Sequence, residues 1–282
     1  MNMRVVMLLL GPLLGAAQGN AQDRFTDATV DGVHVAGSVY LLRGVGGNVG
    51  ASIGPDGTFL IDDDYAPMSE RLLAKLDELG GGRPKLILNT HVHADHVGGN
   101  EFFGGLGVIF AHDNVRVRLL GEDPARATLP IVTFADRLRI HFNDDEIEII
   151  HVPAGHTDGD SIVWFRQANV VHMGDQFWNG LFPRIDTDVG GSVDGYLANI
   201  EQVLGMIGED TQVIPGHGVL GGKAELAAAA EMIRETRQLV DAAIAEDRLD
   251  ALVETGLGER WKSWGAWFIK EETWIRTLAA SR

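Results

Sequence analysis

The chain has 282 residues, no cysteine and a formal net charge of −17 at pH 7, from 23 basic and 40 acidic side chains. This length suits one large domain or two small ones, and it allows a sizeable hydrophobic core. An acidic protein repels polyphosphate, so the composition argues against a nucleic-acid-binding protein. Without cysteine there is no disulfide framework and no thiolate, so any bound metal must be held by nitrogen and oxygen.

Residues 1–21 have the features of an export signal. Arg4 supplies a positive charge, a short apolar stretch follows, and Gly19-Asn20-Ala21 offers small residues for cleavage. The apolar stretch is too short to span a membrane. We therefore expect a signal peptide over 1–21 that is removed, a single domain over 22–282, and a periplasmic or secreted protein without membrane contact. A retained anchor is the alternative.

The first half predicts short strands, glycine-rich turns and two helices. Strands are expected at 39–42, 49–53 and 58–61, separated by turns rich in glycine. A helix is expected to begin near Pro67 and to end at the glycines of 80–82. A strand at 86–88, another at 108–110 and a helix from Asp113 follow.

The second half repeats this order of elements. Strands are expected at about 131–142, 146–152, 161–166, 170–174 and 212–214, with helices through 197–207 and about 223–247. The C-terminal segment is expected to form one more helix that packs on the body, with its tryptophans in the core (the segment contains Trp261, Trp264, Trp267, Phe268 and Trp274). Two groups of strands, each followed by helices, predict an α/β (α+β) protein with two facing sheets in a four-layer sandwich.

The segment from Thr90 to His96 contains three histidines and one aspartate, directly after the apolar run 86–88. Imidazole and carboxylate groups are the ligands by which zinc is held in the absence of thiolates. A loop of this kind can direct His91 and His93 one way and Asp95 and His96 another. One short segment can therefore serve two metal ions.

Three further apolar runs stop at a glycine and bring a ligand-type residue. They precede His156 in 153–157, Asp175 in 170–175 and His217 in 213–218. Binding residues are commonly presented on loops at the ends of rigid strands. We expect these loops to meet the first one at a single edge of the sandwich.

With these motifs, the chain resembles the metallo-β-lactamase superfamily, from the glycines at 46–47 to the Pro-Gly-His-Gly segment at 215–218. The resemblance implies an αββα fold with two zinc ions at one edge. By motif position, one zinc ion would be held by His91, His93 and His156, the other by Asp95, His96 and His217, and both by Asp175. This is the seven-ligand set of glyoxalase II and related hydrolases.

The chain departs from the secreted β-lactamases of this superfamily. One subclass has cysteine where this chain has Asp175, and another has no bridging aspartate. The lysine by which many cysteine-type enzymes anchor the substrate carboxylate is also missing after Asp175. These departures leave the metal site complete and put the substrate in question.

Several other residues have two readings each. Trp178 and Phe182 would form an apolar wall for the substrate or pack within their loop. Arg184 is the candidate carboxylate anchor. Asn100 would donate to a developing oxyanion or cap the following helix. Two histidines near strand ends would support the metal ligands or be structural (His112 and His172).

The residues favour an exported dinuclear zinc hydrolase in which a metal-activated hydroxide, oriented with the help of Asp95, attacks a strained amide or ester. The site would be near +1, which favours a small anionic substrate, and a β-lactam suits an exported enzyme. A lactonase, an esterase and a thioesterase of the glyoxalase II type are the alternatives. A phosphodiesterase and an iron-dependent oxidoreductase are less favoured, and a non-catalytic binding module would be expected to have lost ligands.

Overall fold

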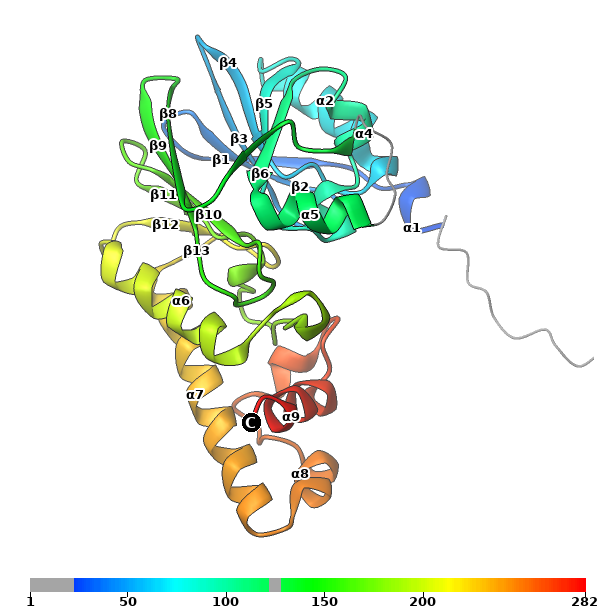
Figure 1. Cartoon of the computed structure of the whole chain (residues 1–282), viewed down its shortest axis with the longest axis vertical. Coiled ribbons are helices and arrows are strands. Elements are labelled where there is room, and N and C mark those ends of the chain that lie inside the picture. Colours follow the sequence, from blue (N-terminus) through cyan, green and yellow to red (C-terminus); the bar gives the residue numbers. More distant parts are fainter. Residues whose placement is uncertain (1–22, 122–127) are drawn as a thin grey trace, which may run out of the picture.

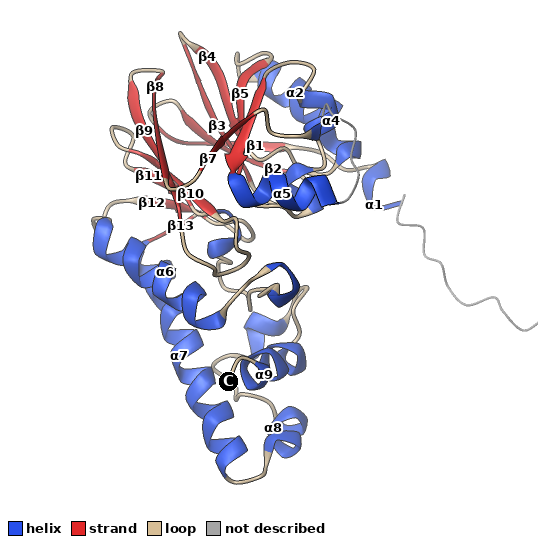
Figure 2. Ribbon diagram, in the orientation of Figure 1, coloured by secondary structure: helices blue, strands red, loops and turns tan. Residues whose placement is uncertain are grey.

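In a computed structural model, which describes residues 23–121 and 128–282, two β-sheets face each other and carry helices on their outer sides (Figure 1; Figure 2). The predicted αββα sandwich is therefore confirmed. The expected signal peptide lies outside the described residues. No described helix is long and apolar enough to cross a membrane.

The first sheet has seven strands in chain order. They are β1 (Asp31–Ala36), β2 (Val39–Arg43), β3 (Val49–Gly54), β4 (Gly57–Ile61), β5 (Pro84–Asn89), β6 (Val108–His112) and β7 (Val132–Phe134). Pairing is antiparallel from β1 to β4 and parallel from β4 to β7. The helical elements of this half are α1 (Asp23–Thr26), η1 (Ala66–Met68), α2 (Ser69–Glu78), α3 (Ala94–Val97), α4 (Asn100–Phe103) and α5 (Asp113–Gly121).

The second sheet has six strands in the order β13-β12-β11-β10-β9-β8. Their bounds are β8 (Arg137–Phe142), β9 (Asp145–His151), β10 (Ser161–Phe165), β11 (Val170–His172), β12 (Gln212–Ile214) and β13 (Gly221–Gly222). Only β11 and β12 pair in parallel within it. The helical elements are η3 (Gly174–Gln176), η4 (Thr187–Val189), α6 (Val193–Met206), α7 (Lys223–Ala245), α8 (Leu249–Thr255), η5 (Lys262–Gly265) and α9 (Glu271–Ala280).

Successive residues of the inner strands face different layers, as the two-residue period of a strand requires. Leu41 and Leu88 lie in the core between the sheets, whereas Leu42 and Ile87 face the helices of the first half. The core between the sheets also receives Ile149 and its neighbours from the second sheet. Because both faces of these strands are buried, they read as continuous apolar runs.

The expected single strand over 131–142 is wrong. The chain turns at Ala135 and Asp136, so β7 pairs with β6 in the first sheet and β8 pairs with β9 in the second. This segment is thus the crossing point between the sheets. Pairing partners, which a local pattern does not contain, decide where a strand is divided.

The expected single C-terminal helix is also wrong. Three separate pieces, α8, η5 and α9, fold back along α7, below the sandwich in Figure 1. Gly256 and Gly258 have φ angles of 78° and 96°, in the left-handed region where only glycine is comfortable. These residues end α8 and turn the chain towards the sandwich.

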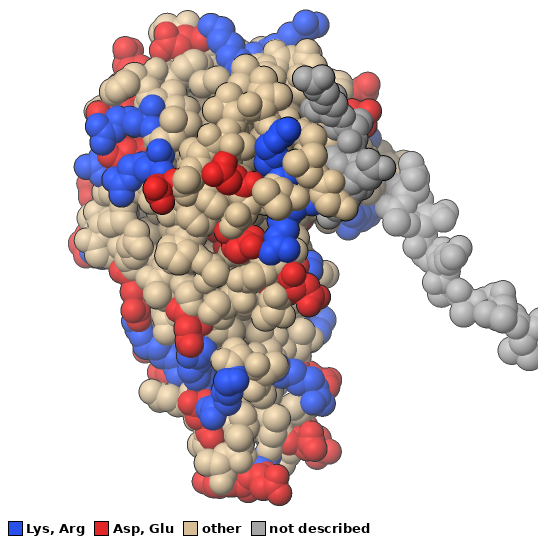
Figure 3. Space-filling model, in the orientation of Figure 1, with Lys and Arg blue, Asp and Glu red and all other residues tan. Residues whose placement is uncertain are grey.

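Charged side chains of both signs are interspersed on the face shown in Figure 3. Arg139, for example, lies within ion-pair distance of Glu146 and Glu148, at 3.4 and 2.9 Å. Exposed pairs of this kind contribute little to stability, about 0–1 kcal/mol each. The stability of the fold must therefore come mainly from its layered core.

His172 is a buried histidine at the end of β11, against Gly50 of the facing sheet, where an added Cβ would lie 2.9 Å from the imidazole Cδ2. Its Nδ1 accepts a hydrogen bond of 3.1 Å from the Gly174 N–H. Burial disfavours the charged ring and lowers its pKa to about 4. This side chain is therefore neutral in the folded protein.

We expect His172→Asn to reduce the loss of stability at acidic pH. The unfolded chain takes up a proton near pH 6.5 and the folded one only near pH 4, so the contribution of His172 is present above pH 6.5 and lost as the pH falls. Between pH 7 and 4 the wild type should lose about 3 kcal/mol more than the variant. Urea unfolding at several pH values measures this, and parallel pH profiles would contradict it.

Candidate metal centre

Loops from both sheets bring ligand-type side chains to one edge of the sandwich. The loop after β5 supplies His91, His93, Asp95 and His96, and loops of the second sheet supply the other three (His156 after β9, Asp175 after β11 and His217 after β12). All seven predicted residues are brought together. They form the groups His91, His93, His156 and Asp175, and Asp95, His96 and His217, in each of which the ligand atoms lie within 4.8 Å of one another.

The Asp175 carboxylate lies between these two groups. Its Oδ2 is 3.7 Å from His91 Nε2 and 3.3 Å from His156 Nε2. Its Oδ1 is 3.1 Å from His96 Nε2 and 3.4 Å from His217 Nε2. Each oxygen thus faces one group, which is the arrangement required of a ligand shared by two ions.

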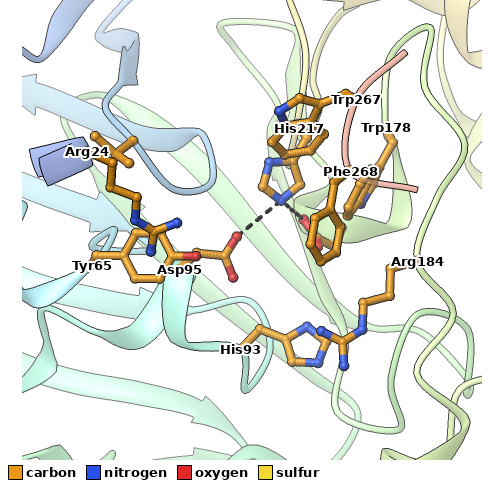
Figure 4. Close-up of a pocket in the computed structure, with 11 residues that line it drawn as sticks. Arg24, Tyr65, His93, Asp95, Trp178, Arg184, His217, Trp267 and Phe268 are labelled. Carbon is orange, nitrogen blue, oxygen red and sulfur yellow. Dashed lines mark ion pairs between the residues drawn. The ribbon is translucent and has the colours of Figure 1, made fainter. Parts of the chain in front are cut away.

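His93 and Asp95, both from the loop after β5, are the more exposed members of the two groups. His93 Nδ1 lies 2.8 Å from His156 Nε2. Asp95 Oδ2 lies 3.3 Å from His217 Nε2 and 3.8 Å from His96 Nε2. Figure 4 shows the Asp95 carboxylate directed at His217, with His93 lower in the view, beside Arg184.

The second ring nitrogen of most of these histidines has a fixed partner. Carboxylates hold two of them, since Asp186 Oδ2 is 2.8 Å from His93 Nε2 and Asp62 Oδ2 is 2.8 Å from His96 Nδ1. Oxygen partners hold two more (Thr90 Oγ1 at 3.0 Å from His91 Nδ1 and the Arg184 carbonyl at 2.7 Å from His156 Nδ1). Such contacts orient the ring and fix its tautomer.

Asp62 and Asp186 contact the predicted ligands but were not predicted from the sequence. Asp62 also accepts hydrogen bonds from Thr90 N and Oγ1, both 2.7 Å long, and so ties the first ligand loop to the end of β4. The backbone of Asp62 is left-handed, with φ at 63°. A signal was present, because three consecutive aspartates follow an apolar strand at 62–64.

The histidines of the cluster fall into two classes, with pKa values below and above the ordinary value of histidine. Burial disfavours the charged ring, so the pKa of His91 lies well below its ordinary value and that of His156 falls to about 4. At His96 and His217 burial is again the largest single effect and lowers the pKa, but the neighbouring carboxylates together outweigh it and raise both pKa values (Asp175, Asp62 and Asp95 at His96; Asp175 and Asp95 at His217). Burial raises the pKa of Asp175 itself less than the surrounding histidines lower it, so this carboxylate remains ionised.

These residues fit divalent metal ions. His91 Nε2, His96 Nε2 and Asp175 Oδ1 are buried and have no hydrogen-bond partner. An unpaired buried polar atom is costly, and three of them aimed at one another require an explanation. Cations between neutral imidazoles and carboxylates satisfy all three and replace the protons that the carboxylates otherwise draw to His96 and His217.

A cavity of about 160 Å³ opens over this cluster. Of the side chains expected to touch the substrate, Trp178 and Arg184 line it. Arg184 also pairs with Asp186, at 2.5 Å, so its charge supports the partner of His93. Trp178 is almost fully buried and packs on His217 with ring centroids 4.4 Å apart.

Phe182 and Asn100 do not line this cavity. Phe182 is fully buried and stacks on Trp274 at 5.8 Å, so it belongs to its loop and the helical core. The Asn100 amide donates to Asn89 Oδ1 and to the Thr128 carbonyl, which leaves no hydrogen for an oxyanion. Nor is it the cap of a helix, since the N-cap of α4 is Gly99 and Asn100 is the first helical residue.

Five lining residues were not anticipated, one of which is Val45. Trp267 was expected in the core, but it lies at the cavity together with Phe268, 46% and 59% exposed, because the broken C-terminal segment brings them there. Arg24 and Tyr65 line the other side (Figure 4). No local signal in the sequence places these distant segments beside the ligand loops.

His112 stacks on His151, with ring centroids 3.6 Å apart, and its Nε2 bonds to the Ala135 carbonyl. It therefore contacts neither ligand group and is structural. His172 accepts its hydrogen bond from the N–H of Gly174, which precedes Asp175, and so supports the loop that carries this ligand.

The fold and the site together define a metal-dependent hydrolase. Residues 35–217 match the family model described as the metallo-beta-lactamase superfamily, so the chain belongs to that superfamily. It is similar to "Metallo-beta-lactamase type 2" of Bacillus cereus, at 24% identity over 63% of this chain and 69% of the relative. It is also similar to hydroxyacylglutathione hydrolase of Thermosynechococcus vestitus, at 29% identity over 68% of this chain and 71% of the relative.

Solved structures agree on the fold. A metallo-beta-lactamase from Pontibacter korlensis superposes with a TM-score of 0.64 at 17% identity, over 73% of this chain and 99% of the other. The superposed relatives are thus covered almost completely, whereas about a quarter of this chain has no counterpart in them.

Asp62→Asn should weaken metal binding about 10–100-fold, the usual effect of removing a carboxylate behind a ligating histidine. Competition with a chromophoric chelator measures the affinity. Asp145→Asn is a matched control, because Asp145 is also buried but accepts from the N–H groups of Gln167 and Ala168, away from the site. Equal affinities of the two variants would contradict the role of Asp62.

Removal of metal should lower the melting temperature, because the unpaired atoms of the cluster are then left without partners. A ligand present at 1,000 times its Kd stabilises by about 4 kcal/mol, which corresponds to about 10 °C here. Calorimetry before and after dialysis against chelator tests this, with zinc added back as the control. An unchanged melting temperature would count against a resident metal.

Proposed function

We propose that this protein is an exported dinuclear zinc hydrolase that opens β-lactams. The observation that carries the proposal is the shared carboxylate, Asp175, with each oxygen facing one of two imidazole groups. When bound there, zinc would lower the pKa of water to about 7 and polarise a carbonyl oxygen. Supporting observations are the similarity to metallo-beta-lactamases and a cavity directly over the cluster.

The protein's own side chains perform the positioning. Asp186 and Asp62 hold His93 and His96, so the ligand atoms keep their aim without rearrangement. Asp95, the least buried of the carboxylates in the cluster, faces the cavity and would orient the attacking water. Trp178 forms part of the wall and limits the access of bulk water to the reacting carbonyl.

A small anionic substrate suits the charge of the site. Two zinc ions would bring +4 and Arg184 brings +1. The four carboxylates at the site bring −4, so a centre near +1 would lie within a strongly acidic chain (Asp62, Asp95, Asp175 and Asp186). β-Lactams carry a carboxylate beside the strained amide. They also act outside the cytoplasm, which agrees with the export signal expected over residues 1–21.

A thioesterase is the second candidate, and a specific residue favours it. The bridging position is aspartate, as the resemblance to glyoxalase II implies, and hydroxyacylglutathione hydrolases are among the similar proteins. The chemistry of the two reactions is shared, since both attack an activated acyl carbon. The substrate pocket therefore decides between them.

Purified protein should hydrolyse penicillins, cephalosporins or carbapenems in a zinc-dependent manner. Chelation and Asp175→Asn should each reduce kcat at least about 100-fold, since the first removes the metal ions and the second removes the charge of the carboxylate that faces both groups of ligands. Lactones, thioesters and a phosphodiester complete the panel, and elemental analysis should find two zinc ions per chain and no iron. Hydrolysis of a thioester with all β-lactams untouched would replace this proposal by the second candidate.

Export is tested separately. Cells that express the full chain should release a periplasmic product beginning at Gln22, whereas a chain that starts at Gln22 should stay in the cytoplasm. Fractionation and N-terminal mass analysis give the answer. An uncleaved, membrane-attached product would show a retained anchor.

A further inference from the structure

The mouth of the cavity is built partly by segments outside residues 35–217, which match the superfamily. Arg24, from α1, lies on one side of the ligand cluster, next to Tyr65 (Figure 4). Trp267 and Phe268, between η5 and α9, lie on the opposite side, next to Trp178. Asp95 and His217 lie between these two sides.

Arg24 lies on a short helix that is fixed to the body of the protein. Phe25 packs edge-on against Tyr65 at 5.6 Å, and Arg71 donates to the Thr26 carbonyl at 3.3 Å, so α1 is fixed to the body. The Arg24 guanidinium lies 4.5 Å from the centre of the Tyr65 ring. Among the described residues it has no carboxylate partner.

The other arginine of the cavity is different. Arg184 already pairs with Asp186, which in turn holds His93. Recruiting Arg184 to a substrate would therefore disturb the support of a ligand. Arg24 can bind an anion without breaking an existing ion pair, and guanidinium matches the geometry of a carboxylate.

The opposite side is aromatic and exposed. The ring centroid of Trp267 lies 5.5 Å from that of Trp178 and 4.9 Å from that of His217. The ring centroid of Phe268 lies 6.4 Å from that of Trp178. These rings form one surface, of which Trp267 and Phe268 leave about half in water. A flat apolar group laid on them would remove that surface from solvent, which is favourable.

We propose that Arg24 and the aromatic pair Trp267 and Phe268 form a two-part recognition site. Arg24 binds a carboxylate, the aromatic pair binds an aryl or other flat apolar group, and the acyl carbon to be attacked lies between them. The preferred substrates are therefore arylacyl derivatives of amino carboxylates. This inference rests on the proposed hydrolase function and specifies its substrate class.

The size of the cavity agrees with this division. Its volume of about 160 Å³ is smaller than that of sites which enclose a whole drug-sized ligand, about 300–1,000 Å³. Only the reacting centre is enclosed, and the ends of the substrate must lie at the mouth. Residues at the mouth then decide affinity.

Three small ligands separate the two contacts in the zinc-loaded protein. Phenylacetylglycine has both groups, acetylglycine lacks the ring, and phenylacetylglycinamide lacks the carboxylate. Calorimetric titration should give the tightest binding for the first. Arg24→Gln should weaken the binding of phenylacetylglycine about tenfold, which is the cost of one charge-assisted contact. The affinity for phenylacetylglycinamide should stay unchanged.

Phe268→Ala should weaken the two phenyl ligands about fivefold and leave acetylglycine unchanged. Two matched controls should change nothing. Arg166→Gln removes an exposed arginine whose guanidinium lies 3.8 Å from the ring centre of Trp164, in β10 of the second sheet. Phe102→Ala removes a 36% exposed phenylalanine outside the cavity.

Equal binding of the three ligands, or an unchanged affinity of Arg24→Gln for phenylacetylglycine, would overturn the recognition site. The ligands contain no strained bond, so their binding is independent of the reaction. A protein that opens β-lactams but binds the ligands alike refutes this inference alone. The expected binding pattern without β-lactam hydrolysis supports this inference and refutes only the proposed reaction.

Discussion

The buried carboxylate of Asp175 is the constraint on which the site depends. It is enclosed by four imidazoles, and each of its oxygens faces two of them. An ionised group at this depth is tolerated only where positive charge surrounds it. The loops that carry these imidazoles must therefore converge, and Asp62 and Asp186 keep the rings directed inwards.

Much of this could be predicted from the sequence, because the information was local. Apolar runs of strand length gave the sheets, and histidines or aspartates at their ends gave the ligands. The four-layer sandwich followed from two groups of strands with helices. Ligand spacing is short-range within the 90–96 loop, so His91, His93, Asp95 and His96 were readily recognised.

The remainder depended on tertiary contacts. The division of 131–142 between two sheets is decided by the neighbours of β7 and β8, not by their residues. Asn100 and Phe182 have side chains suited to a substrate site, but both are buried. The amide of Asn100 already donates two hydrogen bonds, and Phe182 stacks on Trp274. Conversely, Trp267 resembles a core residue in sequence and lies at the cavity because the glycines after α8 redirect the chain.

The ligand loops come from different sheets, four ligands from the first and three from the second. A cation held between them would act as a cross-link between the two halves of the sandwich, at the edge where β5 and β11 end. Neither half could open without releasing it. Metal loading would thus make unfolding more cooperative and slower, so the metal centre would also stabilise the fold of a chain that has no cysteine and therefore no disulfide.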